Sequence, residues 1–370
     1  PEGMKLEGKV ADKRSKNLDV NEYDREYYRY NTHFPLINFG FNPDDGFAIG
    51  AGLLSTLHGF RKEPYAAFHS VGFSVFTATG AFNFNYSGDF TGALGKSDLI
   101  VDASILNPEF VNFFGFGTNS VNPLAGFNFN RVRLEHYRLG LSSRWRLNGN
   151  RNTLRFGPVL ETISLSERDN QIMADPNFPE VPLQDFSFKH FAGANLQFSI
   201  DGTDGKANIR NGLRITADAD YRKRLDSGDD NSGFLRTGGA FSLYLTIPIK
   251  SVDVTLASSV GGDYTFGDFE FYQAPSLGGF RNLRGYRNDR FRGHARWYHN
   301  TDLRLTLFYW DNAILPFEFG MYGGVDYGQI YFRDEENPND ELFVGYAAGV
   351  FFNPLKFLVI TPFMAFSEEQ

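Results

Sequence analysis

The sequence IRNGLRITADADYR, residues 209–222, alternates between two kinds of side chain over most of its length. The apolar or aromatic set comprises Ile209, Leu213, Ile215, Ala217, Ala219 and Tyr221. The polar or charged set comprises Arg210, Arg214, Thr216, Asp218, Asp220 and Arg222. Successive side chains of a β-strand point to opposite faces, so this segment is predicted to be a strand with one apolar and one charged face.

The same alternation recurs along most of the chain. In 137–147 the apolar set is Tyr137, Leu139, Leu141, Trp145 and Leu147, against Arg138, Arg144 and Arg146. In 300–309 the apolar set is Leu303, Leu305, Leu307 and Tyr309, against Asn300, Asp302, Arg304 and Thr306. Such segments predict roughly fifteen strands, an all-β protein. Their ranges are 34–42, 46–58, 67–77, 80–90, 98–107, 131–147, 152–165, 186–200, 207–222, 234–247, 251–271, 297–310, 317–332, 342–352 and 357–367.

Two architectures alternate in this way, a soluble sandwich and a membrane barrel, and two features favour the barrel. Aromatic residues cluster at strand ends, as in the girdles that flank a membrane-spanning belt. The connections alternate between short ones, such as 148–150, and long ones, such as 107–131 and 272–296. Short turns at one rim and long loops at the other are typical of outer-membrane barrels. The sequence therefore predicts a transmembrane antiparallel β-barrel.

Composition agrees with this fold class. The chain has 370 residues with 40 Phe, 18 Tyr and 39 Gly, which favours strands and tight turns. No window approaches 18 consecutive apolar residues, so no transmembrane helix is predicted. There is no Cys, which excludes a disulfide scaffold. The net charge of −8 argues against a nucleic-acid partner.

The domain organisation is predicted to be simple. Residues 1–33 are polar without alternation and are interpreted as a linker or the end of an upstream periplasmic region. Residues 34–370 are predicted to form the barrel. Bacterial barrels normally have an even number of strands, so we expect about 16 in the intact protein, with one closing strand beyond Gln370.

One connection has an unusual composition. Residues 278–286, GGFRNLRGY, lie in the long loop between the eleventh and twelfth predicted strands. The second arginine of this loop, Arg284, is too polar to face lipid.

Leu283-Arg284-Gly285-Tyr286 resembles the (V/L/I)-R-G-(F/Y) signature of the BamA/TamA superfamily of outer-membrane assembly factors, also called the bacterial surface antigen family. Gly324-Val325-Asp326-Tyr327-Gly328 resembles the superfamily's (F/G)-x-D-x-G pattern. The resemblance implies that the loop folds into the barrel and that Arg284 pairs with acidic residues of the following strands. Strand parity places Asp302 and Asp326 on the inner face, where two carboxylates would satisfy one buried arginine. Gly328 completes the expected set of motif partners.

The resemblance also implies a location and a function. Members of the superfamily lie in the bacterial outer membrane and insert other barrels, or pass proteins or lipids across it. A weak seam is expected to open between the last strand and the first, which carries Phe34, Leu36, Asn38 and Gly40 and is short and bounded by Gly and Pro. Expected partners are outer-membrane lipid, lipopolysaccharide, client outer-membrane proteins, and periplasmic or lipoprotein partners.

Two alternative functions stay open. The segments 30–31, 39–46 and 58–65 look like barrels of Bacteroidota in which a metallophosphoesterase domain precedes the barrel. This chain would then anchor or export a fused enzyme, which sequence upstream of Pro1 would reveal. The second alternative is a passive porin, which would have an open lumen.

No site within the chain predicts catalysis or a cofactor. The seven His are scattered without the carboxylate spacing of a metal site. Acidic residues gather in two long loops, at Asp226, Asp229 and Asp230 and within 334–341. Their spacing fits no defined calcium loop, so they are interpreted as solvated loops.

Overall fold

In the computed structural model, one antiparallel sheet of 15 strands accounts for most of the chain. The structure describes residues 29–42, 46–60, 62–118, 129–147, 151–166, 172, 186–227, 232–312, 315–333, 342–355 and 358–369. Each strand of the sheet pairs with its neighbours along the chain, in the order β1 to β11 and then β14 to β17. A second sheet has 2 strands, β12 and β13, and lies within the connection from β11 to β14.

The strand bounds follow the alternating segments closely. The first eight are β1 Thr32–Asn42, β2 Gly46–Leu57, β3 Ala67–Phe76, β4 Phe82–Phe90, β5 Asp98–Asn112, β6 Arg131–Arg146, β7 Thr153–Leu165 and β8 Lys189–Asp201. The others are β9 Gly212–Arg224, β10 Gly233–Ile249, β11 Val252–Gly267, β12 Ser276–Leu277, β13 Phe291–Arg292, β14 Ala295–Trp310, β15 Phe317–Tyr331, β16 Phe343–Pro354 and β17 Phe363–Ser367. The predicted all-β architecture is confirmed.

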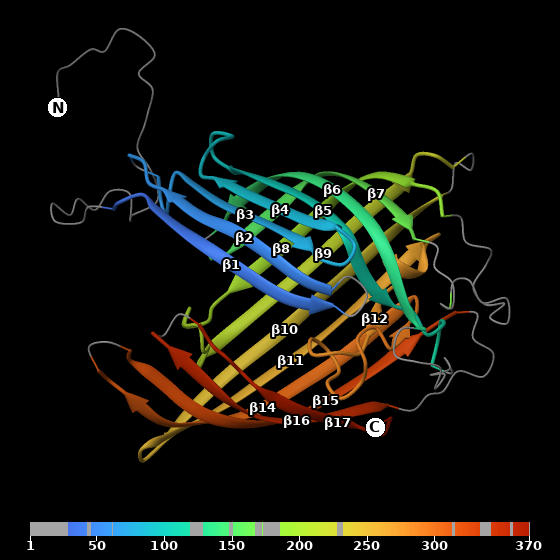
Figure 1. The fold of residues 1–370 in the computed structure, drawn as a ribbon. Helices are drawn as coiled ribbons and strands as arrows, with labels where there is room; N and C mark the ends of the chain where they lie inside the picture. Colours follow the sequence, from blue (N-terminus) through green and yellow to red (C-terminus); the bar gives the residue numbers. More distant parts are fainter. Residues whose placement is uncertain are drawn as a thin grey trace, which may run out of the picture.

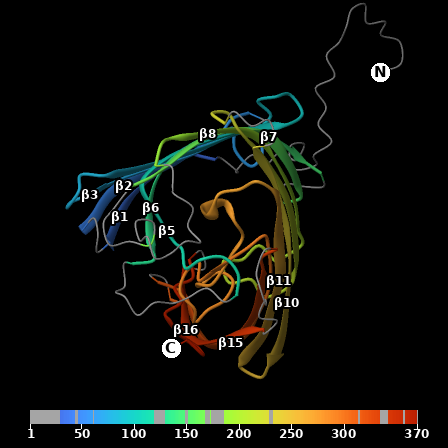
Figure 2. The same ribbon diagram turned by 90° about the vertical axis from the view of Figure 1, so that its right-hand side faces the viewer.

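The sheet curls around a central space. Figure 1 shows β1 to β7 along the top, β10 and β11 across the middle, and β14 to β17 along the bottom. Figure 2 shows the same curl end-on, with the orange segment between β11 and β14 inside it. Among the described residues, β1 and β17 form the two edges of the sheet and are not paired with each other. The segment inside the curl is thus placed to occupy the lumen.

Strand register separates an apolar outer face from a polar inner face. Leu256 of β11 lies opposite Leu303 of β14, and their exposed fractions are 40% and 50%. The neighbouring inner positions Thr255 and Thr306 are only 3% and 2% exposed. Large apolar side chains that stay exposed in the middle of a sheet are those of a lipid-facing belt. The inner face carries the ion pairs, including those of Arg144 with the carboxylates of β4 and β5.

Some predicted strand bounds are wrong. β5 continues through Pro108 to Asn112, with an irregularity in its pairing between Leu106 and Glu109 that accommodates the proline. β11 ends at Gly267, which has a positive φ of 88°, and not at Phe271. Residues 207–211 precede β9 instead of belonging to it, so the connection from β8 to β9 is longer than predicted.

Because of a register shift in β14, one residue lies on the opposite face of the strand from the predicted one. Pairing with β15 is irregular between Thr306 and Phe308, which reverses the parity of the following residues. Tyr309 lies opposite Glu318 and donates from its hydroxyl to Asp253 Oδ2 at 2.9 Å. It was predicted on the apolar outer face, but the irregularity turns it inward. A strict period of two cannot reveal such an insertion.

Several predictions fall outside the described residues. These include most of the proposed linker 1–33, the turn 148–150, Asp229, Asp230 and the acidic stretch 334–341. The sixteenth strand and the domain boundary near residue 33 stay predictions. Of the helices in the described part of the chain, none is both long and apolar enough to span a bilayer.

Candidate functional site

The connection between β11 and β14 forms a compact unit with its own apolar core. It contains the short 3-10 helix Phe271–Gln273, called η3, and the two-stranded sheet of β12 and β13. Its buried cluster consists of Leu277, Leu283, Tyr286, Phe291 and Ile330. Leu277 and Leu283 are both 0% exposed. Because Ile330 belongs to β15, this cluster packs the loop against the barrel wall.

Arg284 is held by two carboxylates of that wall. Its Nε donates to Asp326 Oδ2 at 2.7 Å, and a terminal nitrogen donates to Asp326 Oδ1 at 2.6 Å. The same terminal nitrogen donates to Asp302 Oδ1 at 2.7 Å. The backbone N–H of Arg284 also donates to Asp326 Oδ2, at 2.8 Å. Asp326 is 0% exposed and Arg284 is 8% exposed, so this is a buried, charge-assisted cluster.

The glycines around this cluster make room for the loop. A Cβ at Gly324 would lie 2.2 Å from Asp302 Oδ1 and 2.6 Å from a terminal nitrogen of Arg284. A Cβ at Gly328 would lie 2.8 Å from a methyl group of Leu277. The glycines of the Gly324–Gly328 segment therefore have a physical role, since the loop docks where β15 lacks side chains. The structure brings Arg284, Asp302 and Asp326 together, and Gly328 lies against Leu277 of the same loop.

The loop also contacts the strands beyond β15. A Cβ at Gly345 of β16 would lie 1.9 Å from the carbonyl oxygen of Arg284. Gly285 has a positive φ of 93°, and a Cβ there would lie 2.3 Å from the carbonyl oxygen of Phe366 in β17. Ser367 donates from its hydroxyl to the carbonyl oxygen of Gly285 at 2.9 Å. The tetrad thus touches four consecutive strands, β14 to β17.

The aromatic residue of the tetrad anchors the loop to β16. The rings of Tyr286 and Phe343 are 5.9 Å apart, and those of Phe291 and Phe343 are stacked at 3.9 Å. Burial raises the pKa of the Tyr286 phenol above its usual value, so this side chain is neutral near pH 7. The contact is therefore one of apolar packing.

The predicted seam residues lie along β1, on the edge of the sheet. Phe34, Leu36, Asn38 and Gly40 have the same parity, and their partners on β2 are Leu54, Gly52, Gly50 and Ala48. β1 has 11 residues and pairs with β2 along its whole length, so the expectation of a short first strand is wrong. The shorter edge strand is β17, with 5 residues.

The inner wall holds a second charged cluster that the sequence did not predict. His136 of β6 contacts Glu109 at 2.5 Å through Nδ1 and Glu161 at 2.7 Å through Nε2. Arg222 contacts the other oxygen of Glu161 at 3.4 Å. In the part of the chain that the structure describes, no three His, Cys, Asp or Glu are grouped to hold a metal ion. The cluster therefore pairs charges across strands β5, β6, β7 and β9.

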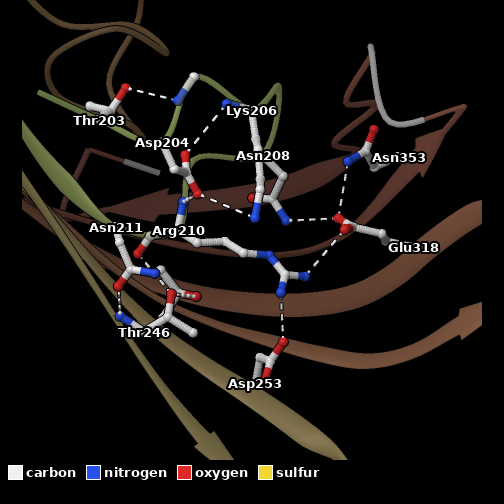
Figure 3. A network of polar contacts seen from close by, with 12 residues as sticks. Thr203, Asp204, Lys206, Asn208, Arg210, Asn211, Thr246, Asp253, Glu318 and Asn353 are labelled. Atoms are coloured by element: carbon white, nitrogen blue, oxygen red, sulfur yellow. Dashed lines mark hydrogen bonds and ion pairs between the residues drawn. The ribbon is translucent and has the colours of Figure 1, made fainter. Parts of the chain in front are cut away.

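A third network lies at the short-turn rim, where the connection from β8 to β9 reaches across the lumen (Figure 3). Arg210 donates to Asp253 of β11 at 2.7 Å and to Glu318 of β15 at 3.2 Å. Glu318 also accepts from Asn208 at 3.3 Å and from Asn353 at 3.0 Å. The sequence placed Arg210 on a strand, so this bridge was missed, although parity would have put Glu318 inside.

Glu318→Gln is expected to destabilise the folded protein by about 1–3 kcal/mol, because hydrogen bonds to a buried charged acceptor are replaced by weaker ones. Glu318 is 6% exposed, so little water is available to compensate. The measurement is the midpoint of urea unfolding in detergent. Lys206→Gln is the control, because the Lys206 side chain is 59% exposed and its contact with Asp204 is long, at 3.6 Å. An unchanged midpoint for Glu318→Gln would show that the bridge does not contribute to stability.

Comparison with known proteins agrees with this architecture. The family model of the haemolysin secretion/activation proteins ShlB/FhaC/HecB matches residues 192–352, less than half of the chain. No curated protein sequence matches the chain. Among solved structures, BamA from Haemophilus ducreyi lacking POTRA domains 1–3 is similar with a TM-score of 0.60 and 13% identity, over 91% of this chain and 67% of that chain. CdiB from Escherichia coli is similar with a TM-score of 0.54 and 12% identity, over 90% of this chain and 61% of that chain.

The class of protein follows from the fold and these matches. The chain is a β-barrel protein of the bacterial outer membrane, as predicted. Its fold is similar to that of BamA and CdiB, and the resemblance to the BamA/TamA superfamily is supported at that level. The matches give no support to a fusion with a metallophosphoesterase in Bacteroidota, and that fusion stays a prediction. The absence of catalysis in this chain also stays a prediction.

Proposed function

We propose that this barrel inserts other polypeptides into the outer membrane or moves them across it. The observation that carries the proposal is the loop inside the sheet, which Arg284 fixes to β14 and β15 through Asp302 and Asp326. The fold of BamA and CdiB and the match to a family of secretion proteins support the same class of function. Unfolded clients and outer-membrane lipid are the proposed partners.

The lumen loop argues against the passive porin. Porins keep an aqueous channel open through the barrel. Here the unit around Leu277 and Leu283 has a dry core and packs against the inner wall at Ile330. A side-chain core of this kind takes up space that a diffusion channel would need.

The proposed route for a client is the pair of sheet edges. β17 has 5 residues, and its Met364 and Phe366 are 67% and 51% exposed. On β1, Phe34 and Phe39 are 62% and 79% exposed. Unpaired strand edges are templates for adding another strand. The proposal is that a client strand pairs with one of these edges before it is released into lipid.

The function is tested by reconstitution. The protein is incorporated into liposomes, and a urea-unfolded outer-membrane barrel protein is added from outside. We expect the added barrel to fold several-fold faster than with empty liposomes, measured by its mobility on a gel without heating. A second arm adds an unfolded secreted polypeptide and measures its protection from protease inside the liposomes.

Liposomes that carry a porin of similar size are the control for membrane defects around any barrel. An effect in the first arm supports insertion, and an effect in the second supports translocation. The proposal would be abandoned if both rates equalled those of the porin liposomes.

A further inference from the structure

A cavity of about 1090 Å³ lies in the lumen at the long-loop end. Its walls are the inner faces of β11 and β14, the end of β5, and the lumen loop around Phe280. We call it the arginine chamber, because six arginines line it. They are Arg131, Arg236, Arg281, Arg287, Arg292 and Arg296.

Three carboxylates line the same chamber, and each is already engaged by a cation of the protein. Glu109 contacts His136 at 2.5 Å, and Asp263 accepts from Arg296 at 2.6 Å. Asp289 contacts Arg292 at 3.2 Å. Among the described residues of the lining, the arginines exceed the carboxylates by three, and Asp220, which lies outside it, contacts one of them, Arg236, at 3.9 Å. This lining carries an excess of positive charge although the chain carries −8.

Two of the arginines extend into the chamber with weak partners. The Arg281 guanidinium lies 5.5 Å from the centre of the Phe280 ring, and the residue is exposed. Arg236 contacts Asp220 at 3.9 Å and is 39% exposed at its side chain. Guanidinium groups bind carboxylate and phosphate oxygens through their fork of N–H donors. These two side chains are accordingly placed to receive an oxyanion.

A neighbouring cavity of the same lumen shares Arg236 with the chamber, and without Arg236 the described lining of the chamber still has five arginines against three carboxylates. The neighbouring cavity has a volume of about 500 Å³ and is lined by Arg138, Arg155 and Arg236 against Asp102, Asp218 and Asp220. Its charges balance, as expected for side chains that pair across strands. The positive excess is therefore a property of the chamber next to the lumen loop.

We infer that the arginine chamber is a binding site for oxyanions, the carboxylate or phosphate groups of a ligand that enters from the long-loop rim. Low-dielectric walls focus the field of the arginines on the enclosed solvent and raise the local concentration of anions. The inference does not depend on the proposed function, since it needs only the charge of the chamber and its access to solvent.

The chain contains no Cys, so a single introduced thiol reports the local potential. Phe280→Cys places it in the chamber, because Phe280 lines the cavity and is 65% exposed. Purified protein in detergent is treated with an anionic and a cationic methanethiosulfonate reagent, and each rate is divided by the rate for a free thiol. We expect the normalised rate of the anionic reagent to exceed that of the cationic reagent by about fivefold to tenfold. A potential near one kT raises the first rate and lowers the second, which gives a ratio of this size.

Ser104→Cys is the matched control, since Ser104 lines the charge-balanced cavity. Its rate ratio is expected to be close to one. Adding Arg281→Gln to Phe280→Cys should lower the ratio toward the control, and high salt should do the same. The inference is overturned if the chamber ratio equals the control ratio or favours the cation. It is also overturned if the anionic reagent does not react, because an oxyanion site must be accessible.

Competition separates two sources of the oxyanion. Inorganic phosphate and hexaglutamate are added separately, and protection of the thiol from the anionic reagent is measured. Protection by phosphate indicates a site for small anions, and protection by hexaglutamate alone indicates a site for an acidic polypeptide segment. Protection by neither, at constant ionic strength, would contradict binding.

Discussion

Arg284→Ala is expected to lower the stability of the folded barrel by about 3–5 kcal/mol, the usual effect of removing one partner of a buried ion pair. Among the described residues, the substitution leaves Asp326, which is 0% exposed, with only the backbone N–H of residue 284 as a donor. Asp302 loses its closest cation as well. The measurement is the midpoint of urea unfolding in detergent, together with the fraction of folded protein in the outer membrane.

Arg304→Ala is the control for the loss of a lumen arginine. Arg304 also contacts Asp302, but at 3.5 Å and with 27% of its side chain exposed, so its removal should have a small effect. Equal midpoints for the two variants would contradict a special role for Arg284. The unfolding midpoint of Asp326→Asn should fall as that of Arg284→Ala does. The substitution removes the charge that pairs with Arg284 while keeping the shape of the side chain.

Gly285→Ala is the second substitution with a large expected effect. Alanine at a φ of 93° is strained, and its Cβ would lie 2.3 Å from the carbonyl oxygen of Phe366. Either the loop or β17 has to move, and we expect a loss of about 1–3 kcal/mol or more. Limited proteolysis should then cleave near β17 faster than in the unmodified protein.

Gly345→Ala tests the docking of the same tetrad on β16, since its Cβ would lie 1.9 Å from the carbonyl oxygen of Arg284. Gly323→Ala is the control, because nothing lies within 4 Å of a Cβ at that position of β15. Wild-type proteolysis of both Gly285→Ala and Gly345→Ala would mean that the loop does not hold β16 and β17.

The fold could be predicted from the sequence wherever alternation was uninterrupted. The segment 209–222 is an example, since from Leu213 onward its two faces are those of β9. The prediction failed where the backbone departs from a period of two, as at Tyr309 after the irregularity in β14. It also failed at 207–211, where apolar and polar residues alternate but lie between β8 and β9.

The candidate site was predictable in part. Parity placed Asp302 and Asp326 inside, and the resemblance linked them to Arg284. The contact of Gly285 with β17 could not be predicted, because it depends on the depth to which the loop enters the lumen. The bridge from Arg210 to Glu318 joins residues 108 positions apart, and no local pattern marks such a pair.

The tetrad Leu283 to Tyr286 precedes in sequence the strands β14 to β17 to which it is fixed, whereas other parts of the loop also contact β5 and β8. Arg284 is 18 residues from Asp302 and 42 from Asp326, and Gly285 is 82 from Ser367. Contacts between residues close in sequence cost little loop-closure entropy and form early in folding. We therefore expect the tetrad and β14 to β17 to form a folding unit, since the contacts of the loop with β5 join residues 180 positions apart and cost more loop-closure entropy. On this order of folding, the barrel is expected to close around a loop that is already docked, so that the loop does not have to be threaded into it afterwards.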